Sequence, residues 1–132
     1  MSGQHQPHIV GAILAGFVLM AAGASVSVPA RAQARADAKA LFEKRCGGCH
    51  ALDRDKEGPR LGGVYGRTAG SVDSFQYSDA LRKSGVKWTD ETLNKWLTDT
   101  EKLVPNNDMT FHVENSDERS EIIAYLKQNS GK

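Results

Sequence analysis

An excess of charge of either sign is missing from this sequence: 17 Lys and Arg nearly balance 16 Asp and Glu among 132 residues. Without a basic excess, the chain lacks the electrostatic footprint of a protein that binds nucleic acid. Internal repeats and low-complexity tails are also missing. No stretch alternates apolar and polar residues long enough to predict a convincing strand. The length leaves room for one domain, and the absence of strand patterns points to helices.

Charged residues are also missing from a twenty-residue run near the N-terminus, residues 9–28. Pro29 and the small-residue run ARAQA follow it. An apolar run closing in A-x-A-like triplets predicts a secretory signal peptide over residues 1–34, with Ala32 or Ala34 as the last residue removed. The leading MSGQHQPH carries no Lys or Arg, and twenty apolar residues are long enough to span a bilayer. An uncleaved anchor is therefore the alternative, and in both cases residues 35–132 form the domain.

Capping residues and a helical period predict a small all-α domain. The helices are expected over residues 36–45, from Ser78 to Gly85, after an N-cap at Thr89, and from Asn115 or Ser116 onward. Asn115 and Glu118 have the spacing of a capping-box pair. Residues 56–70 and the LVPNNDMTF stretch, 103–111, read as loops because Gly, Pro and Asn interrupt any regular period.

Cysteine is nearly absent, and both copies lie in CGGCH, as Cys46 and Cys49 with His50 directly after. A thioredoxin-like dithiol would need neighbouring strands. A structural zinc site would need four ligands and would have to recruit His112 from sixty residues away. A disulfide is permitted in an exported protein but leaves His50 without a role. Covalent haem attachment is favoured, because thiols at this spacing reach both vinyl groups of a porphyrin and place the next imidazole beneath the iron.

Methionine is almost as scarce, with Met1, Met20 and Met109. Signal cleavage would remove the first two, so Met109 would be the one thioether left in residues 35–132. It lies in a predicted loop, where a lone methionine is a poor core filler and a candidate sixth ligand for iron. His112 competes for this position, although we expect it to be a solvated loop histidine.

Further segments follow CGGCH in a recognisable order: GPRLGGVYGRTAG, FQYSDALRKSGVKW, TLNKWL, VPNNDMTF and IIAYLK. Over residues 36–127 this pattern resembles class I cytochrome c, with similarity closest to mitochondrial cytochrome c and its soluble bacterial periplasmic relatives. The resemblance implies a small cytochrome c fold, with helices and long loops wrapped around one covalently bound haem c. It also implies a one-electron carrier, cycling between Fe(III) and Fe(II), and not an enzyme.

The resemblance assigns roles at the iron. It implies that Cys46 and Cys49 anchor the haem by thioether bonds, and that His50 and Met109 are the proximal and distal ligands. Pro59 would accept a hydrogen bond from the His50 ring on its carbonyl oxygen and so orient the imidazole.

Further roles implied by the resemblance concern the haem periphery. Arg67, Tyr77 and Trp88 match residues that hold the propionates. Trp96 matches an aromatic residue beside the methionine sulfur, and Phe111 one that shields the haem edge. The first and last helices are expected to cross closely through Ala38, Phe42, Ile122 and Tyr125.

The chain departs from the family at three places. The segment between His50 and Gly58 is shorter than in mitochondrial forms. Asn107 stands where a threonine often bonds a propionate, and Leu81 where an asparagine joins the polar network near the methionine. The hydrogen bonds of those two positions are therefore not carried over.

Charge divides the domain, since residues 35–67 hold 8 basic and 5 acidic side chains and residues 68–132 hold 8 and 11. A strongly basic docking face is not predicted. What remains is a smaller patch made by Lys44, Arg45, Arg54, Lys56 and Arg60, and such charges chiefly set encounter rate and partner choice.

The expected partners are redox proteins: a quinol-oxidising complex, a dehydrogenase or a terminal oxidase. We expect a monomer in the bacterial periplasm, or a form anchored to the periplasmic face of the inner membrane if residues 1–34 are retained. Two alternatives stay open. A peroxidase or ligand-sensing haem enzyme would need an open distal side, and an electron-entry subunit would be permanently bound to a larger enzyme.

Overall fold

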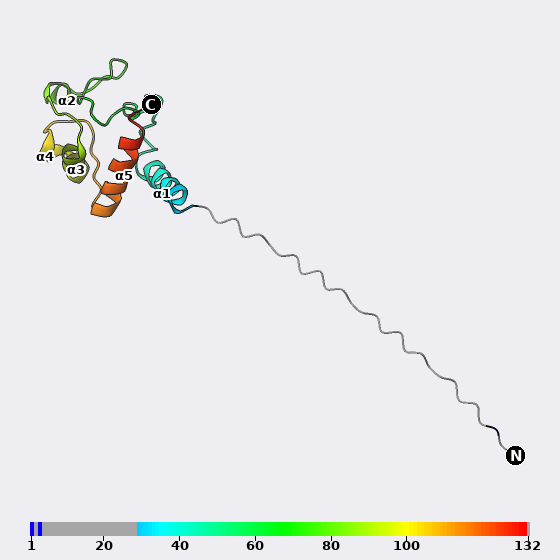
Figure 1. The fold of residues 1–132 in the computed structure, drawn as a ribbon. Coiled ribbons are helices and arrows are strands. Elements are labelled where there is room, and N and C mark those ends of the chain that lie inside the picture. The colour runs from blue at the N-terminus through cyan, green and yellow to red at the C-terminus, as the bar shows by residue number, and fades with distance from the viewer. Residues whose placement is uncertain (2, 4–28, 132) are drawn as a thin grey trace.

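The computed structural model describes Met1, Gly3 and residues 29–131 of the chain. Within these residues the chain forms five helices, in the order α1 (Ala30–Arg45), α2 (Asp79–Lys83), α3 (Asp90–Thr98), α4 (Thr100–Leu103) and α5 (Ser116–Gln128). Long loops follow α1 and α4, and the described part contains no strand beyond an isolated bridge between Thr68 and Lys87 (Figure 1). The all-α prediction is confirmed.

Helix α1 begins at Ala30, earlier than the predicted residue 36. The segment ARAQARADAKA is rich in alanine, the residue with the highest helix propensity, so the helix continues N-terminally as far as Pro29. Lys44 and Arg45 occupy its last turn, where positive charge interacts favourably with the helix dipole. The helix runs directly into Cys46, as predicted.

Helices α2 and α3 begin at the predicted caps. The Ser78 hydroxyl accepts from the Leu81 N–H at 3.3 Å, and the chain leaves α2 through Gly85 with φ of +67°. Thr89 makes a reciprocal capping box with Thr92, which opens α3. Side chains of Leu93, Trp96 and Leu97 are buried along one face of this helix. The short helix α4 was not predicted; Asp99 separates it from α3 and accepts from the Lys102 N–H at 3.0 Å.

Helix α5 begins after Asn115, whose side-chain oxygen accepts from the N–H groups of Asp117 and Glu118 at 2.8 and 3.0 Å. The N-cap prediction is thus confirmed. The Glu118 carboxylate has another partner, because it accepts from the Arg45 guanidinium of α1 with an Nε–Oε2 distance of 2.8 Å. Helices α1 and α5 pack against each other, with the rings of Phe42 and Tyr125 5.1 Å apart and Ile122 fully buried (Figure 1).

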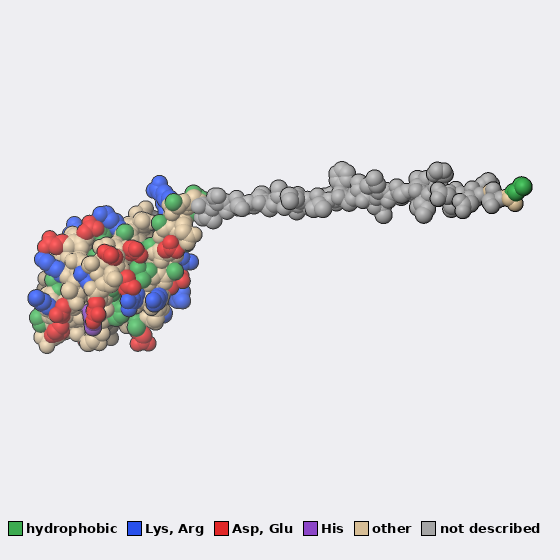
Figure 2. All heavy atoms as spheres, turned by 90° about the horizontal axis from the view of Figure 1, so that it is seen from below, with side chains coloured by type: hydrophobic (Ala, Val, Ile, Leu, Met, Phe, Trp, Pro, Cys, Tyr) green, Lys and Arg blue, Asp and Glu red, His purple; other side chains and the backbone are tan. Residues whose placement is uncertain are grey.

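Charged side chains of both signs cover the surface. Figure 2 shows Lys and Arg interspersed with Asp and Glu over the visible face of the domain, with no large area of one sign. Several of these residues pair with each other, including Lys95 with Glu91 at 2.6 Å and Lys127 with Asp90 at 2.9 Å. Exposed pairs of this kind contribute little to stability individually.

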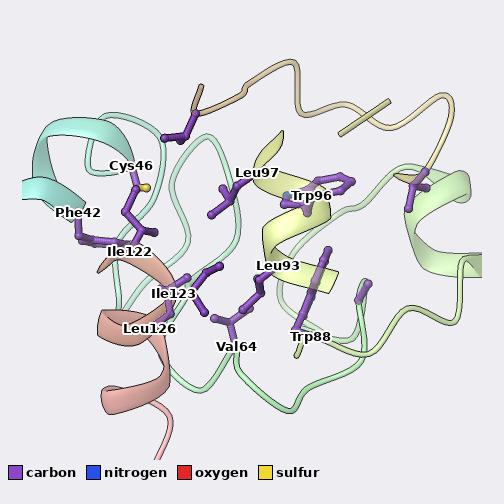
Figure 3. Close-up of a cluster of buried hydrophobic side chains, with 13 residues drawn as sticks. Phe42, Cys46, Val64, Trp88, Leu93, Trp96, Leu97, Ile122, Ile123 and Leu126 are labelled. Carbon is purple, nitrogen blue, oxygen red and sulfur yellow. The ribbon is translucent and has the colours of Figure 1, made fainter. Parts of the chain in front are cut away.

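The hydrophobic core is contributed by helices and loops together. Phe42, Cys46 and residues of α5 lie toward one side, and residues of α3 together with Trp88 lie toward the other (Figure 3). Loop residues complete the cluster, notably Val64, Ala69, Val104 and Val113. The core therefore depends on long loops as much as on helix packing.

Most of the predicted signal peptide, residues 1–34, lies outside the described residues. Positions 30–34 are described and form the first turns of α1. In the part of the chain that the structure describes, no helix combines the length and apolar character needed to cross a membrane. The choice between a cleaved signal and an anchor stays a prediction.

Candidate functional site

A hollow of about 420 Å³ lies in the domain, with walls from α1, α2, α3, α5 and the loops between them. Its lining is predominantly apolar and includes Leu61, Leu93, Leu97, Ile122 and Leu126. The ten residues singled out from the sequence all line this same hollow: Cys46, Cys49, His50, Pro59, Arg67, Tyr77, Trp88, Trp96, Met109 and Phe111. Residues spread over most of the domain thus converge on one place.

The CGGCH segment forms a turn at the end of α1. The Cys46 N–H donates to the Phe42 carbonyl at 2.8 Å, and the N–H groups of Cys49 and His50 both donate to the Cys46 carbonyl, at 3.1 and 2.8 Å. Both thiols are free, Cys46 buried and Cys49 exposed. Burial raises the pKa of the Cys46 thiol to about 11. The turn thus presents two unpaired thiols and an imidazole to the hollow.

The His50 ring is held from one side by the next loop. Its Nδ1 lies 2.8 Å from the Pro59 carbonyl oxygen, so Nδ1–H donates and Nε2 keeps its lone pair. Burial, the largest cause, and the positive charge of Lys56 lower the pKa of His50, whereas the Pro59 bond opposes them. A neutral imidazole with a fixed tautomer is the form that ligates metals.

Close approach of the backbone to this ring requires glycine at position 58. A Cβ atom built on Gly58 would lie 2.2 Å from His50 Cε1. The Gly58 N–H donates to the Cys49 carbonyl at 2.8 Å, which ties the 51–60 loop to the CGGCH turn. The 51–60 loop thereby brings Pro59 to the histidine.

Met109 is half-buried on the wall of the hollow. The Thr100 hydroxyl donates to its carbonyl oxygen at 2.6 Å, and its N–H donates to the Asn107 side-chain oxygen at 2.8 Å. His112, the competing candidate, is exposed and lies 3.7 Å from Glu114, outside the set of described residues that line the hollow. Among residues 29–131, no three His, Cys, Asp or Glu side chains gather as a group that could hold a metal ion.

A polar group lies at the edge of the hollow. The Arg67 guanidinium donates to the carbonyls of Gly62 and Arg60, at 3.2 and 3.0 Å. Burial is the main cause of the lowered pKa of Arg67 and of the raised pKa of the Tyr77 phenol. Trp88 is buried next to Trp96, with ring centroids 5.4 Å apart. A half-buried cation, a neutral phenol and an indole are suited to hold anionic groups of a ligand.

Leu81 and Asn107, two of the three departures from the resemblance, lie differently in the structure. Leu81 is part of the wall, where the resemblance implies an asparagine. Asn107 is buried but is not among the lining residues, and its side chain bonds the loop around Met109. Thr100 was not singled out from the sequence, because the polar contact it makes joins residues nine positions apart through a loop.

The residues present fit a haem c. The hollow is apolar and large, two free thiols stand on one turn at its wall, and an imidazole with an available Nε2 and a thioether are also part of its lining. Gly58 leaves room for the imidazole where a side chain would collide with it. Sulfur and imidazole donors are those that haem iron takes in electron-transfer proteins.

Comparison with known proteins agrees with this fit. The family model described as cytochrome c matches residues 35–130. Cytochrome c of Euglena viridis is 44% identical over 67% of this chain and 90% of its own length. Cytochrome c2 of Blastochloris viridis is 38% identical over 85% of this chain and 90% of its own length.

A solved structure shows the same fold. Cytochrome cH from Methylobacterium extorquens superposes with a TM-score of 0.67 and 38% identity, covering 71% of this chain and 97% of that chain. Proteins of this family carry a single haem c on a cysteine pair, and Cys46 and Cys49 are the two cysteines here. The chain therefore belongs to the cytochrome c family, binds one haem c covalently through Cys46 and Cys49, and is an electron-transfer protein and not an enzyme.

Proposed function

We propose that His50 and Met109 are the two axial ligands of the haem iron, and that the protein shuttles single electrons between redox complexes in the bacterial periplasm. The observation that carries the proposal is that the two side chains line one hollow together with both cysteines. The haem supplies an iron that gains and loses one electron. With both axial positions taken, no position is open for oxygen or peroxide, which suits a carrier.

The surrounding residues are proposed to orient the two ligands and to raise the reduction potential of the haem. Pro59 holds the His50 ring through Nδ1 and so directs Nε2 toward the ligand position. A neutral thioether from Met109 favours the ferrous state and raises the reduction potential, and the apolar wall acts in the same direction by excluding water. Arg67, Tyr77 and Trp88 are proposed to hold the propionates, Trp96 to lie beside the Met109 sulfur, and Phe111 to cover the haem edge.

Location and partners are part of the proposal. The signal-like N-terminus and covalent haem attachment, which takes place outside the bacterial cytoplasm, support a periplasmic protein or one anchored to the inner membrane. Proposed partners are a quinol-oxidising complex, a dehydrogenase or a terminal oxidase. The protein is proposed to bind them as a monomer. The mixed charge in Figure 2 favours a partner surface that is not strongly acidic.

Reduction potentials of Met109→Ala and His112→Ala test the ligand assignment. Met109→Ala should retain covalent haem and lower the midpoint potential by on the order of 0.1 V or more, since axial ligands tune haem potentials over roughly 0.8 V. His112→Ala is the matched control and should leave the potential near the parent value. An unchanged potential in Met109→Ala, or a large fall in His112→Ala, would contradict the proposal.

A further inference from the structure

We propose that Thr100 and Asn107 are positioning residues that hold the Met109 peptide from both sides and thereby keep its side chain in the hollow. This inference rests on the proposed function, in which Met109 is an axial ligand. The geometry that points to it is a pair of hydrogen bonds, one to the Met109 carbonyl and one from the Met109 N–H. Among the described residues of the 103–111 loop, Met109 alone has both its N–H and its carbonyl hydrogen-bonded by side chains.

Thr100 supplies the bond on the carbonyl side. Its hydroxyl donates to the Met109 oxygen at 2.6 Å, and the side chain is only 5% exposed. Its position is set by Asp99, an extended residue that ends α3 and caps α4, so Thr100 is the first residue of α4. Because water has little access to this threonine, removing the hydroxyl leaves the Met109 carbonyl without its donor.

Asn107 supplies the bond on the amide side. Its side-chain oxygen accepts from the Met109 N–H at 2.8 Å, while its Nδ2 donates to the Val104 carbonyl at 2.9 Å and to Glu101 at 3.3 Å. The amide is buried, so all three contacts depend on its orientation. The side chain thus links Met109 to α4 and to the residue that follows it.

The backbone around these residues is shaped to make the contacts. Asn106 has φ of +61°, in the left-handed region, and its N–H donates to Glu101 at 2.9 Å. Past Met109, the Val113 N–H donates to the Leu97 carbonyl at 2.7 Å. The loop therefore leaves from α4 and returns to the junction of α3 and α4, with Thr100 closing it at Met109.

This arrangement has a function beyond packing. A thioether binds iron weakly, so its occupancy depends on how often the loop presents the sulfur. A loop tied on both sides of the Met109 peptide holds the sulfur in place when an outside ligand competes for the iron. Loosening either tie should make such competition easier while His50 and the cysteines stay in place.

Imidazole binding to the oxidised full-length haem protein measures this competition. Thr100→Val keeps the shape of the side chain but loses the hydroxyl, and should bind imidazole roughly three- to tenfold more tightly, the factor that one hydrogen bond represents. When the pH or the temperature is raised, the weak far-red sulfur-to-iron absorption band of Thr100→Val should fade earlier than that of the parent protein. Thr100→Ser should restore the parent behaviour, and Asn107→Ala should shift imidazole affinity in the same direction as Thr100→Val.

Thr98→Val is the matched control, because Thr98 makes a similar bond, to the Asn94 carbonyl at 2.7 Å, but is exposed and distant in function from Met109. Equal imidazole affinity in Thr100→Val, Thr98→Val and the parent would overturn the inference. Met109→Ala separates the two proposals. If it leaves the absorption band intact, the ligand assignment fails; if it removes the band while Thr100→Val changes nothing, the positioning role alone fails.

Discussion

At the scale of single residues, two neighbours in the next loop determine the environment of His50, the proposed proximal ligand. One backbone carbonyl, from Pro59, selects the ring tautomer. One missing side chain, at Gly58, leaves space for the ring. These two neighbours in the sequence therefore set both the orientation and the clearance of the imidazole.

Gly58→Ala should destabilise the haem protein by about 1–3 kcal/mol, because the added methyl would lie 2.2 Å from His50 Cε1 and overpack the site. The free energy of unfolding in denaturant, followed by far-UV circular dichroism, measures this. Gly48→Ala is the control, since nothing lies within 4 Å of a Cβ at that position of the CGGCH turn. Equal free energies of unfolding for the two variants would show that the 51–60 loop can shift to accommodate the added methyl group without loss of stability.

At the same scale, the sequence alone pointed to four residues of the site. Spacing and scarcity were enough for Cys46, Cys49, His50 and Met109, because covalent attachment and sulfur ligation restrict residue type. The roles of Arg67, Tyr77 and Trp88 came from family resemblance, since they lie on loops with no period that would bring them together. Thr100 shows no such signal in the sequence, because its hydrogen bond to the Met109 carbonyl joins residues nine positions apart through a loop.

At the scale of elements, hydrogen bonds join the 51–60 loop, which contacts His50, to the loop that carries Tyr77. The Ser74 hydroxyl donates to Asp55 Oδ2 at 2.6 Å, and the Arg60 N–H donates to Asp55 Oδ1 at 2.8 Å. The Arg60 guanidinium also donates to the Ser74 hydroxyl at 2.8 Å. These contacts, with the Ser74 bond as the largest cause, hold the pKa of Asp55 below its ordinary value of 3.8.

Loss of this link in acid should be measurable. Because the pKa of Asp55 is lower in the folded protein than in the unfolded chain, its contribution to stability is complete above the unfolded value of 3.8 and is lost as the pH falls through the folded value. Asp55→Asn should therefore be less stable than the parent at pH 6, and the difference should shrink toward zero in acid. Chemical unfolding at several pH values measures this.

The control for that experiment is Asp53→Asn, whose carboxylate pairs with the neighbouring Arg54 at 3.4 Å and is mostly exposed. We expect Asp53→Asn to follow the parent at every pH. A stability difference between Asp55→Asn and the parent that stays constant with pH would contradict the assigned role of the Asp55 charge.

The same scale shows which helices the sequence could predict. Ser78, Thr89 and Asn115 are side-chain caps followed by apolar residues at helical spacing, and each opens a helix in the structure. Helix α4 is too short to display a period, and Asp99 is both the C-cap of α3 and the N-cap of α4. Sequence patterns do not separate two helices that are joined by a single residue.

At the scale of the whole molecule, the helices and loops of the domain surround the hollow. Without the haem, the mostly apolar walls of the hollow of about 420 Å³ would face water, and exposing apolar surface costs free energy. An ordinary domain is stable by only about 5–15 kcal/mol. The covalently bound haem is therefore part of the core and not an addition to it.

The proposed function depends on a haem c bound between His50 and Met109 with both axial positions taken. The absorption spectrum of the purified oxidised protein, recorded before and after cyanide addition, is the sharpest test of this binding. A low-spin spectrum with the weak far-red sulfur-to-iron band, and only slow reaction with cyanide, is expected. A high-spin spectrum without that band, together with rapid cyanide binding, would show that the distal position is open.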